Sequence, residues 1–295
     1  MIAPAASLRA DGRRLHLQHG PIDLIVAVTG DPAAIRSAYG RATARFATVL
    51  EELCGELPDL RRPVDGTPCR LAGTVARRMH AAVRPHAAQG FITPMAAVAG
   101  AVAEEILLAM TAEAGLLQAA VNNGGDIALH LAPGEEIRIG LVDQPDAPRL
   151  IGTTTIRAVD GIRGVATSGW RGRSFSLGIA DAVTILARTA AEADAAATVV
   201  ANAVDLPGHP NILRRPASAL QHDTDLGTRP VVRGVGPLAP GEIEHALCRG
   251  VAVARALIGR GLIAAAALHL QGRTVTAGDA PFGLDGPETR EDIAA

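Results

Sequence analysis

The chain alternates between segments with a helical spacing of apolar residues and short, continuously apolar runs typical of buried strands. Residues 22–28 form such a run and predict a strand. Asp31 and Pro32 then provide a helix cap and a first-turn proline, and apolar residues recur every three or four positions until Gly55. These apolar positions are Ala38, Ala42, Phe46, Val49 and Leu53. The pattern predicts a long helix with one buried face.

Further elements follow the same two patterns. Helices are expected at residues 93–114, 189–204 and 241–261. Strands are expected at residues 116–121, 127–131, 138–142, 153–156 and 176–187, with a hairpin-like pair at 262–276 around Gly272. Residues 58–68 and 206–240 contain several prolines and no clear periodicity, so they are predicted as connections.

This order of elements predicts an α+β fold, in which mixed or antiparallel sheets pack against long alanine-rich helices, rather than a strict βαβ series. Twice, a long alanine-rich helix adjoins a strand with a glycine-rich bend, which indicates two related halves. We therefore expect a single domain over residues 1–280, built from two related lobes at about 13–150 and 151–280. Residues 281–295 are predicted to form a polar tail.

The composition is that of a folded protein, and it excludes several classes of function. Of the 295 residues, 48% are hydrophobic and 20% are charged. Aromatic residues account for only 2%, and 28 basic residues balance 30 acidic ones, which argues against a nucleic-acid partner. The chain contains no lysine, and this rules out Schiff-base chemistry and a phosphate-loop lysine.

Cysteine usage and hydropathy bear on the location of the protein. The three cysteines form no C-x-x-C pair, which is typical of a reducing compartment. The first residues lack the apolar core of a signal peptide. The most apolar run, residues 251–270, contains Arg255 and Arg260 and is therefore predicted to be buried in the protein. We expect a cytoplasmic protein that does not bind a membrane.

Asp194 and Thr198 lie four positions apart in the helix expected at 189–204, and Asn202 extends the same stripe by one turn. A carboxylate and a hydroxyl at this spacing are typical of a Mg²⁺ or Ca²⁺ site, because both ions prefer oxygen ligands. Alternatively, Asp194 complements the dipole of its own helix and Thr198 bonds back to a helix carbonyl. The spacing by itself leaves both interpretations open.

The sequence Asn-Asn-Gly-Gly-Asp at residues 122–126 forms either a hairpin turn or a bend that binds a ligand. Asn and Gly adopt positive φ angles at little cost, which favours the turn. In the functional interpretation, Gly124 and Gly125 let the backbone approach a ligand, while Asp126 orients a hydroxyl or a base.

Residues 167–169, Thr-Ser-Gly, combine with Arg171 and Arg173 into a candidate anion-binding loop. The two arginines are equally compatible with ordinary surface charges. Ser168 has no neighbouring histidine and lies outside any G-x-S-x-G pattern, so support for a nucleophilic role is weak. Thr93 opens a predicted helix, where it either caps the helix or leaves the first amides to bind phosphate.

At these residues the chain resembles the ApbE-type FAD:protein FMN transferases. The shared motifs, in order, are Asn-Asn-Gly-Gly-Asp-Ile at 122–127, Ala-Thr-Ser-Gly at 166–169, the strand 183–185 and Ala-Asp-Ala-Ala-Ala-Thr at 193–198. The chain is more similar still to an uncharacterised bacterial and archaeal branch of that superfamily, through residues 19–24, 94–100 and 172–174. The resemblance covers roughly residues 13–270.

The resemblance implies a two-lobed α+β fold that holds FAD or a related nucleotide, together with Mg²⁺, in the cleft between the lobes. It implies a transferase or a hydrolase that acts on this nucleotide. The metal would be bound by Asp194, Thr198 and a main-chain carbonyl near Gly100. The residues expected to contact the nucleotide are Asn123, Gly124, Gly125, Thr167, Gly169 and Arg173, and the expected catalytic residues are Asp126 and Ser168.

The chain also departs from the transferases. It has Ala99-Gly100 where they carry Lys-Gly, and it lacks their His-x-x-Asp-Pro-x-Thr-Gly segment between Gly169 and Asp194. These missing segments motivate a further hypothesis, a non-catalytic accessory protein that serves a partner enzyme in cofactor metabolism or in sulfur and homocysteine metabolism, with which the closer branch is associated. Another is an enzyme that binds a small carboxylic acid through Arg171 and Arg173. The sequence is compatible with a homodimer.

Overall fold

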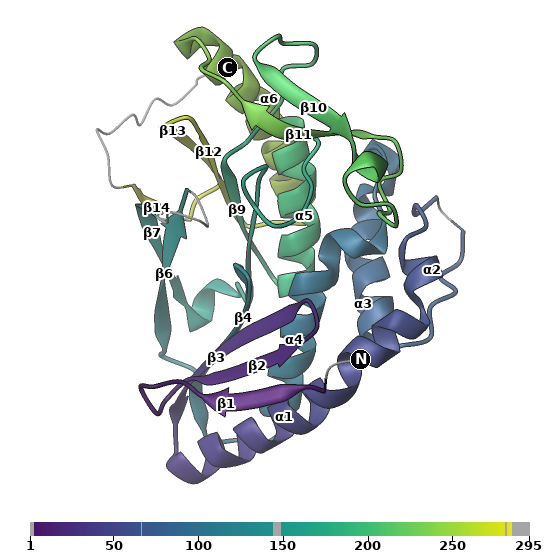
Figure 1. The fold of residues 1–295 in the computed structure, drawn as a ribbon. Helices are drawn as coiled ribbons and strands as arrows, with labels where there is room; N and C mark the ends of the chain where they lie inside the picture. Colours follow the sequence, from purple (N-terminus) through teal and green to yellow (C-terminus); the bar gives the residue numbers. More distant parts are fainter. Residues whose placement is uncertain (1–2, 66, 144–148, 281, 285–295) are drawn as a thin grey trace.

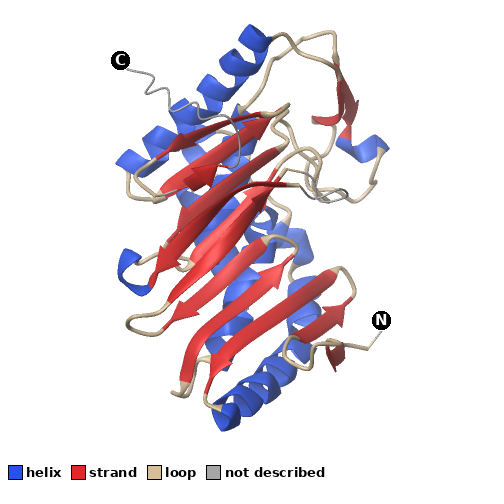
Figure 2. Cartoon of the chain, turned by 90° about the vertical axis from the view of Figure 1, so that its left-hand side faces the viewer, coloured by secondary structure: helices blue, strands red, loops and turns tan. Residues whose placement is uncertain are grey.

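A nine-stranded antiparallel sheet forms the centre of the structure, a computed structural model that describes residues 3–65, 67–143, 149–280 and 282–284 (Figure 1). The strand order is β1-β2-β3-β4-β5-β8-β9-β12-β13. The strands are β1 (Ala5–Leu8), β2 (Leu15–His19), β3 (Ile22–Gly30), β4 (Leu116–Asn123), β5 (Asp126–Leu131), β8 (Gly164–Ser168), β9 (Ala182–Ala187), β12 (Ala265–Leu270) and β13 (Arg273–Ala277). Figure 2 shows these strands side by side with the long helices behind them.

Helices cover one face of this sheet. The α-helices are α1 (Pro32–Gly55), α2 (Leu57–Leu60), α3 (Thr74–Val83), α4 (Val98–Met110), α5 (Ala190–Ala203) and α6 (Pro240–Gly259). Short 3₁₀ helices are η1 (Arg84–Gln89), η2 (Pro94–Ala97), η3 (Ala158–Asp160) and η4 (Ala217–Ala219). The helices α4 and α5 pack against each other, α4 on β4 and β5 and α5 on β8 and β9. The α+β class expected from the sequence is therefore confirmed.

The helix α1 forms as its pattern predicts. Asp31 accepts hydrogen bonds from the amides of Ala33 and Ala34, and Pro32 is the first helical residue. The five apolar positions predicted to be buried are the buried residues of this helix: Ala38, Ala42, Phe46, Val49 and Leu53. Local capping and apolar spacing are sufficient to define this element.

A second, three-stranded sheet adds a layer on the other side of the central sheet. It contains β6 (Glu136–Val142), β7 (Leu150–Arg157) and β14 (Phe282–Leu284) in the order β14-β7-β6. Ile139 and Ile156 pack with Leu129 and Leu186 of the central sheet. The predicted polar tail is wrong for β14, which pairs with β7. Residues 281 and 285–295 of that tail lie outside the described residues.

The connection expected at residues 206–240 contains an antiparallel pair, β10 (Ile212–Pro216) with β11 (Pro230–Val235). Its charged and proline-rich sequence gives no alternating pattern, and long-range contacts hold it instead. Arg214 donates hydrogen bonds to Asp205 and to the Leu177 carbonyl, and the Val232 amide donates to the Ser176 carbonyl. The hairpin therefore covers residues 176–178.

Other boundaries also differ from those expected. The predicted strand 176–187 is reduced to β9, because the Ile179 amide bonds to the Val204 carbonyl at the end of α5 instead of joining the sheet. The predicted helix 93–114 begins as a 3₁₀ turn and ends at Met110. The predicted loop 58–68 begins inside α2.

The central sheet is continuous across the two lobes expected at 13–150 and 151–280. The strand β5 of the first pairs with β8 of the second, through Ile127 with Val165 and Ala128 with Gly164. No single helix within the described residues is long and apolar enough to cross a membrane, and the bent pair of segments Thr74–Gln89 and Pro94–Met110 meets that test by length and composition alone.

Candidate functional site

Three of the predicted site residues meet where the first turn of α4, the start of β5 and the N-terminal part of α5 come together. The Gly100 amide of α4 donates a hydrogen bond to Asp194 Oδ2 of α5, with an N–O distance of 2.9 Å. Asp126 is the first residue of β5, and its Oδ1 accepts a hydrogen bond of 3.2 Å from the Thr167 amide. The negative charge of Asp194 contributes to a raised pKa of Asp126. The structure thus brings two carboxylates into one site.

The helices α4 and α5 exchange carboxylate contacts at their N-terminal ends. Asp194 binds the first turn of α4, and Glu104 of α4 accepts a hydrogen bond of 3.3 Å from the Ala191 amide in the first turn of α5. Carboxylates are favourable at helix N-termini because the free amides and the helix dipole are positive there. The close approach needs a glycine, since a Cβ on Gly100 would lie 2.2 Å from the Ala190 carbonyl oxygen. Asp194 therefore caps a neighbouring helix rather than its own.

Both carboxylates are held in environments that favour the protonated form. Asp194 keeps part of its surface open to solvent, but burial by the surrounding protein raises its pKa to about 7, against the opposing effect of the Gly100 and Ala99 amides. Burial, followed by the Asp194 charge, raises the pKa of Asp126 well above its usual value. The Thr167 amide and the charge of Arg173 oppose this rise in the pKa of Asp126.

The Asn-Asn-Gly-Gly-Asp segment is the turn between β4 and β5, and a cationic side chain lies against it. Gly124 and Gly125 have φ angles of +66° and +113°, and the Gly125 amide donates to Asn122 Oδ1 at 2.8 Å. A Cβ on Gly124 would lie 2.3 Å from Arg173 Nη2. The turn and the ligand-binding interpretations are thus compatible, because the absence of a Cβ at Gly124 leaves room for the guanidinium of Arg173.

The side chain of Asn123 points to the same site. Asn123 Nδ2 donates a hydrogen bond of 3.1 Å to the carbonyl oxygen of Ala99, the residue before Gly100. Asn123 is buried, with 6% of its surface exposed. It fixes the main-chain segment for which the resemblance implies a metal-ligating carbonyl, and that role of Gly100 remains a prediction.

Thr198 lies on α5 between two anchored positions. One turn before it, Asp194 contacts α4, and one turn after it, Asn202 Oδ1 accepts a hydrogen bond of 2.9 Å from the Leu177 amide. Residues at this spacing share one face of a helix. The predicted stripe therefore faces the region between the first turn of α4 and the segment 176–178, and Thr198 is partly exposed there.

Thr167 and Ser168 point to opposite faces of the sheet, because side chains alternate along a strand. The Thr167 hydroxyl bonds to the Thr184 hydroxyl at 2.9 Å, and only its amide contacts Asp126. Ser168 lies on the same side as Ala166, which is buried in the core formed with α5. Ser168 is the residue of this motif whose side chain shares a face with Asp126.

Asp181, the residue before β9, received no role from the sequence. Its Oδ1 accepts hydrogen bonds from Arg171 Nε at 2.8 Å and Trp170 Nε1 at 3.0 Å. Gly169 is packed so closely that a Cβ there would lie 2.3 Å from the Asp181 carbonyl oxygen. The guanidinium of Arg171 is thus engaged, and Arg173 is left as the exposed arginine of this loop. A lone acid directly before the largely apolar strand β9 was the sequence signal for this role.

Thr93 does not cap the helical segment that follows it. No hydrogen bond joins its side chain to the turn η2. Its buried hydroxyl donates instead to Asp225 in the loop that follows β10, and Arg229 of the same loop stacks on the Phe91 ring at 3.3 Å. The first turn of α4, which follows η2, meets an internal carboxylate, Asp194. Phosphate binding by the amides that follow Thr93 stays a prediction.

Comparison with known proteins gives the family. A family model described as "AbpE bacteria" matches residues 6–276. The protein belongs to this ApbE-like family. A UPF0280 protein of Methanothrix thermoacetophila is 40% identical over 143 residues, which are 48% of this chain and 55% of the relative. A UPF0280 protein of Methanosarcina acetivorans is 33% identical over 185 residues, 62% of this chain and 70% of the relative.

A solved structure is also similar to this ApbE-like chain. The apo form of Pseudomonas stutzeri flavinyl transferase ApbE matches with a TM-score of 0.49 and 13% sequence identity. The match covers 94% of this chain and 96% of the transferase. The chain spans about half the length of the first curated relatives that it matches.

A metal at the ApbE-like site would depend on mixed oxygen donors. Among the described residues, no group of three or more His, Cys, Asp and Glu side chains is placed to hold a metal ion. Asp126 and Asp194 provide two carboxylates, and the remaining predicted donors are the Thr198 hydroxyl and main-chain oxygens. Such a set suits a hard ion that retains water ligands and does not suit zinc.

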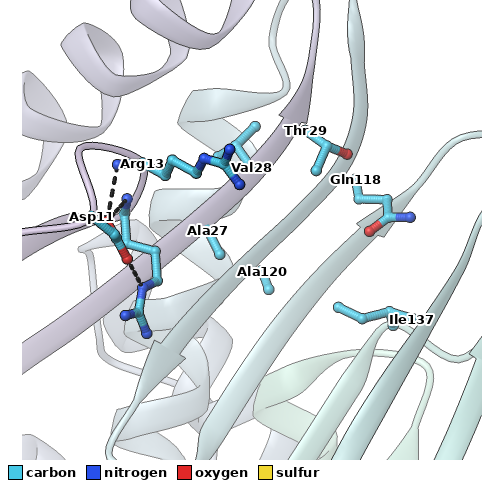
Figure 3. Close-up of a pocket in the computed structure, with 9 residues that line it drawn as sticks. Asp11, Arg13, Ala27, Val28, Thr29, Gln118, Ala120 and Ile137 are labelled. Carbon is cyan, nitrogen blue, oxygen red and sulfur yellow. Dashed lines mark hydrogen bonds and ion pairs between the residues drawn. The ribbon is translucent and has the colours of Figure 1, made fainter. Parts of the chain in front are cut away.

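A shallow pocket lies away from these residues. It has a volume of about 250 Å³ and is formed by β3, β4, β6 and the residues around Asp11 (Figure 3). Its lining is Asp11, Arg13, Arg14, Ala27, Val28, Thr29, Gln118, Ala120 and Ile137. It contains none of the residues that the sequence predicts for the nucleotide or the metal.

Proposed function

We propose that this ApbE-like protein binds FAD or a related flavin nucleotide together with Mg²⁺, and acts on the pyrophosphate of that nucleotide by transfer or hydrolysis. The main support is the pair Asp126 and Asp194, two carboxylates of like charge brought together beside exposed Arg173. Like charges in a poorly solvated site are unfavourable unless a proton or a cation joins them. The composition favours a cytoplasmic setting for this activity.

The donor set fits Mg²⁺. Each carboxylate has more acceptor positions than the backbone amides use, and Asp194 lies one helical turn from the Thr198 hydroxyl. Asn123 holds the Ala99–Gly100 main chain in the same site. Asp194, Thr198 and a carbonyl near Gly100 would hold the ion, and Asp126 would face it. When bound, such an ion neutralises a pyrophosphate and polarises its P–O bonds.

The other residues of the site have distinct tasks in this proposal. Gly124 and Gly125 present backbone without side chains, so the nucleotide can approach the turn closely. Arg173 meets the phosphates with an exposed guanidinium. Asp126 and Ser168, on one face of the sheet, are positioned to transfer a proton at the reacting phosphate. Thr167 acts through its amide, which orients Asp126.

A thermal-shift titration tests this function. Melting temperatures are measured with FAD, FMN and ATP, each with and without MgCl₂, for the wild type and for Asp194→Asn. A ligand at 100 times its Kd stabilises a protein by about 2.7 kcal/mol. We expect stabilisation by a flavin nucleotide that requires Mg²⁺ and is lost in Asp194→Asn. If no nucleotide gives metal-dependent stabilisation, the proposal is wrong.

A second candidate is a non-catalytic accessory protein that assists a partner enzyme. The observation in its favour is that Asp194 already has a structural role as the cap of α4. The absence from the chain of the transferases' His-x-x-Asp-Pro-x-Thr-Gly segment points the same way. Recovery of a stable partner enzyme, without turnover by the protein alone, would favour this candidate. Nucleotide turnover that disappears in Asp194→Asn would exclude it.

A further inference from the structure

Asp181 is a point of convergence between three segments of the chain. Its side chain is 6% exposed and lies directly before β9. In addition to the two hydrogen bonds from Trp170 and Arg171, its Oδ2 accepts a hydrogen bond of 2.6 Å from the Gln271 amide. A buried carboxylate with three donors is strongly held, and removing it would leave Arg171 without its counterion.

These contacts fix the base of the loop at residues 169–173 and leave its tip free. The Trp170 amide donates to the Ala180 carbonyl at 3.0 Å, and the Gly172 amide donates to the Gly169 carbonyl at 3.1 Å. Trp170 and Arg171 are partly buried, with the guanidinium 4.6 Å from the indole ring. In contrast, Gly172, Arg173 and Ser174 are exposed. The position of Arg173 is therefore set by the residues before it.

Gln271 connects the loop base to another part of the fold. It is the non-glycine residue with a positive φ, 44°, among the described residues. Its side chain accepts a hydrogen bond of 3.1 Å from the Leu238 amide and donates one of 2.8 Å to the Gly236 carbonyl. Asp181 and Gln271 together join the loop at residues 169–173 to the turn between β12 and β13 and to the segment before α6.

We infer that Asp181 is a positioning residue, which holds the loop at residues 169–173 so that Arg173 meets the phosphates of the nucleotide beside Gly124. This inference rests on the proposed function. Arginine has a long, flexible side chain, and a fixed loop base reduces the ordering that binding requires. Asp181 contacts no ligand itself in this arrangement and acts through Arg173.

The single tryptophan of the chain, Trp170, reports directly on the loop base. In Asp181→Asn we expect Trp170 emission at longer wavelength and greater quenching by acrylamide. We also expect FAD affinity in MgCl₂, measured by calorimetry, to fall by about tenfold or more. The control is Glu105→Gln, which removes another largely buried carboxylate, one that bridges Arg45 and Arg78. Glu105→Gln should lower the stability of the fold and leave both the Trp170 fluorescence and the FAD affinity unchanged.

A double-mutant cycle separates positioning from general destabilisation. If Asp181 acts through Arg173, Asp181→Asn should have little further effect on FAD affinity in the Arg173→Met background. Equal effects in both backgrounds, or wild-type affinity in Asp181→Asn, would overturn the positioning role and leave the proposed function intact. If the wild type binds no FAD with Mg²⁺, the proposed function fails and the positioning role fails with it.

Trp170→Phe keeps the test decisive if Asp181→Asn does not fold. It removes one of the three donors and retains the Arg171 ion pair. We expect a weaker form of the same loss of FAD affinity, again suppressed in the Arg173→Met background. Wild-type affinity in Trp170→Phe would then overturn the inference.

Discussion

Asp194 on α5 accepts a hydrogen bond from the Gly100 amide on α4, across 94 positions of sequence. One turn further along α4, Glu104 accepts the corresponding bond from the Ala191 amide of α5. Each helix thus supplies the carboxylate at the first turn of the other. Under the proposed function Asp194 also binds the cation, so the stability of the helix pair and the binding of a ligand would be coupled through one side chain.

The first prediction concerns the close approach of the two helices. In Gly100→Ala, the new Cβ would lie 2.2 Å from the Ala190 carbonyl oxygen and 2.9 Å from Asp194 Cβ. The first neighbour is backbone and cannot move without shifting α5. We expect a loss of about 2–3 kcal/mol in the free energy of unfolding, measured by urea denaturation.

Gly40→Ala is the matched control for this change. Gly40 is an exposed residue within α1, and no atom lies within 4 Å of a Cβ built there. Alanine should therefore stabilise the protein by about 0.5–1 kcal/mol, as expected for a helix interior. If Gly100→Ala were as well tolerated as Gly40→Ala, the packing of α4 on α5 would be different from that described.

The second prediction separates the two roles of Asp194. Asparagine retains an acceptor for the Gly100 amide and removes the charge, whereas alanine removes both. We expect Asp194→Ala to be less stable than Asp194→Asn by about 1 kcal/mol in urea denaturation, which measures the cap. Both variants should lose Mg²⁺-dependent stabilisation by a flavin nucleotide. Retention of that stabilisation in Asp194→Asn would contradict a metal-binding role.

The raised pKa of Asp194 predicts how the stability of the fold depends on pH. The Asp194 carboxyl has a pKa of about 7 in the fold, against 3.8 as reference, so its ionisation opposes folding. Without metal, the destabilisation caused by ionising Asp194 is absent below pH 3.8, grows as the pH rises towards 7, and is constant above that. Between pH 5 and pH 8 in EDTA, the wild type should therefore lose stability relative to Asp194→Asn. If the stabilities of the wild type and Asp194→Asn changed in parallel with pH, Asp194 would ionise in the fold as it does in the unfolded chain.

Much of the fold could be predicted where local pattern and burial agree. The helix α1 has its cap, its proline and its apolar face within one segment. The strand β9 is apolar except for Thr184 because both of its faces are covered, by the α5 side of the core and by the second sheet. The hairpin of β10 and β11 could not be predicted, since its contacts with Asp205 and Ser176 come from other parts of the chain.

The sequence indicated residues that lie close together in the fold, and it did not indicate the contacts between them. The motif residues Asn123, Asp126 and Asp194 do converge, as their shared resemblance implied. Periodicity could not show that Asp194 caps α4, nor that the Thr167 hydroxyl pairs with Thr184 on the opposite face. Those contacts depend on the register of β8 with β9 and on the approach of two helices, which local sequence does not encode.

The third prediction tests the turn between β4 and β5. In Gly124→Ala, the Cβ would displace the Arg173 guanidinium, whose flexible end can move away. The φ of +66° also costs alanine about 1–2 kcal/mol. We expect that loss of stability together with weaker FAD binding in MgCl₂.

Gly12→Ala is the control, because Gly12 has a φ of +65° and no atom within 4 Å of its Cβ position. It should lose similar stability with unchanged FAD affinity, and equal affinity in both variants would argue against a role for Arg173.

The last prediction concerns acid stability and His86 in η1. This histidine is 3% exposed, and burial, with a smaller effect from the Arg260 charge, lowers its pKa from 6.5 to about 4. A depressed histidine pKa stabilises the fold fully above pH 6.5, and the contribution is lost as the pH falls towards 4, because protonation then favours the unfolded chain. This shift in the pKa of His86 corresponds to about 3 kcal/mol at most.

Urea midpoints at pH 7.5 and 4.5 should therefore differ more for the wild type than for His86→Leu, which has no proton to take up. His222→Leu, at an exposed position, is the control and should behave as the wild type does. Equal acid sensitivity of His86→Leu and the wild type would show that the His86 side chain is open to water in the folded protein.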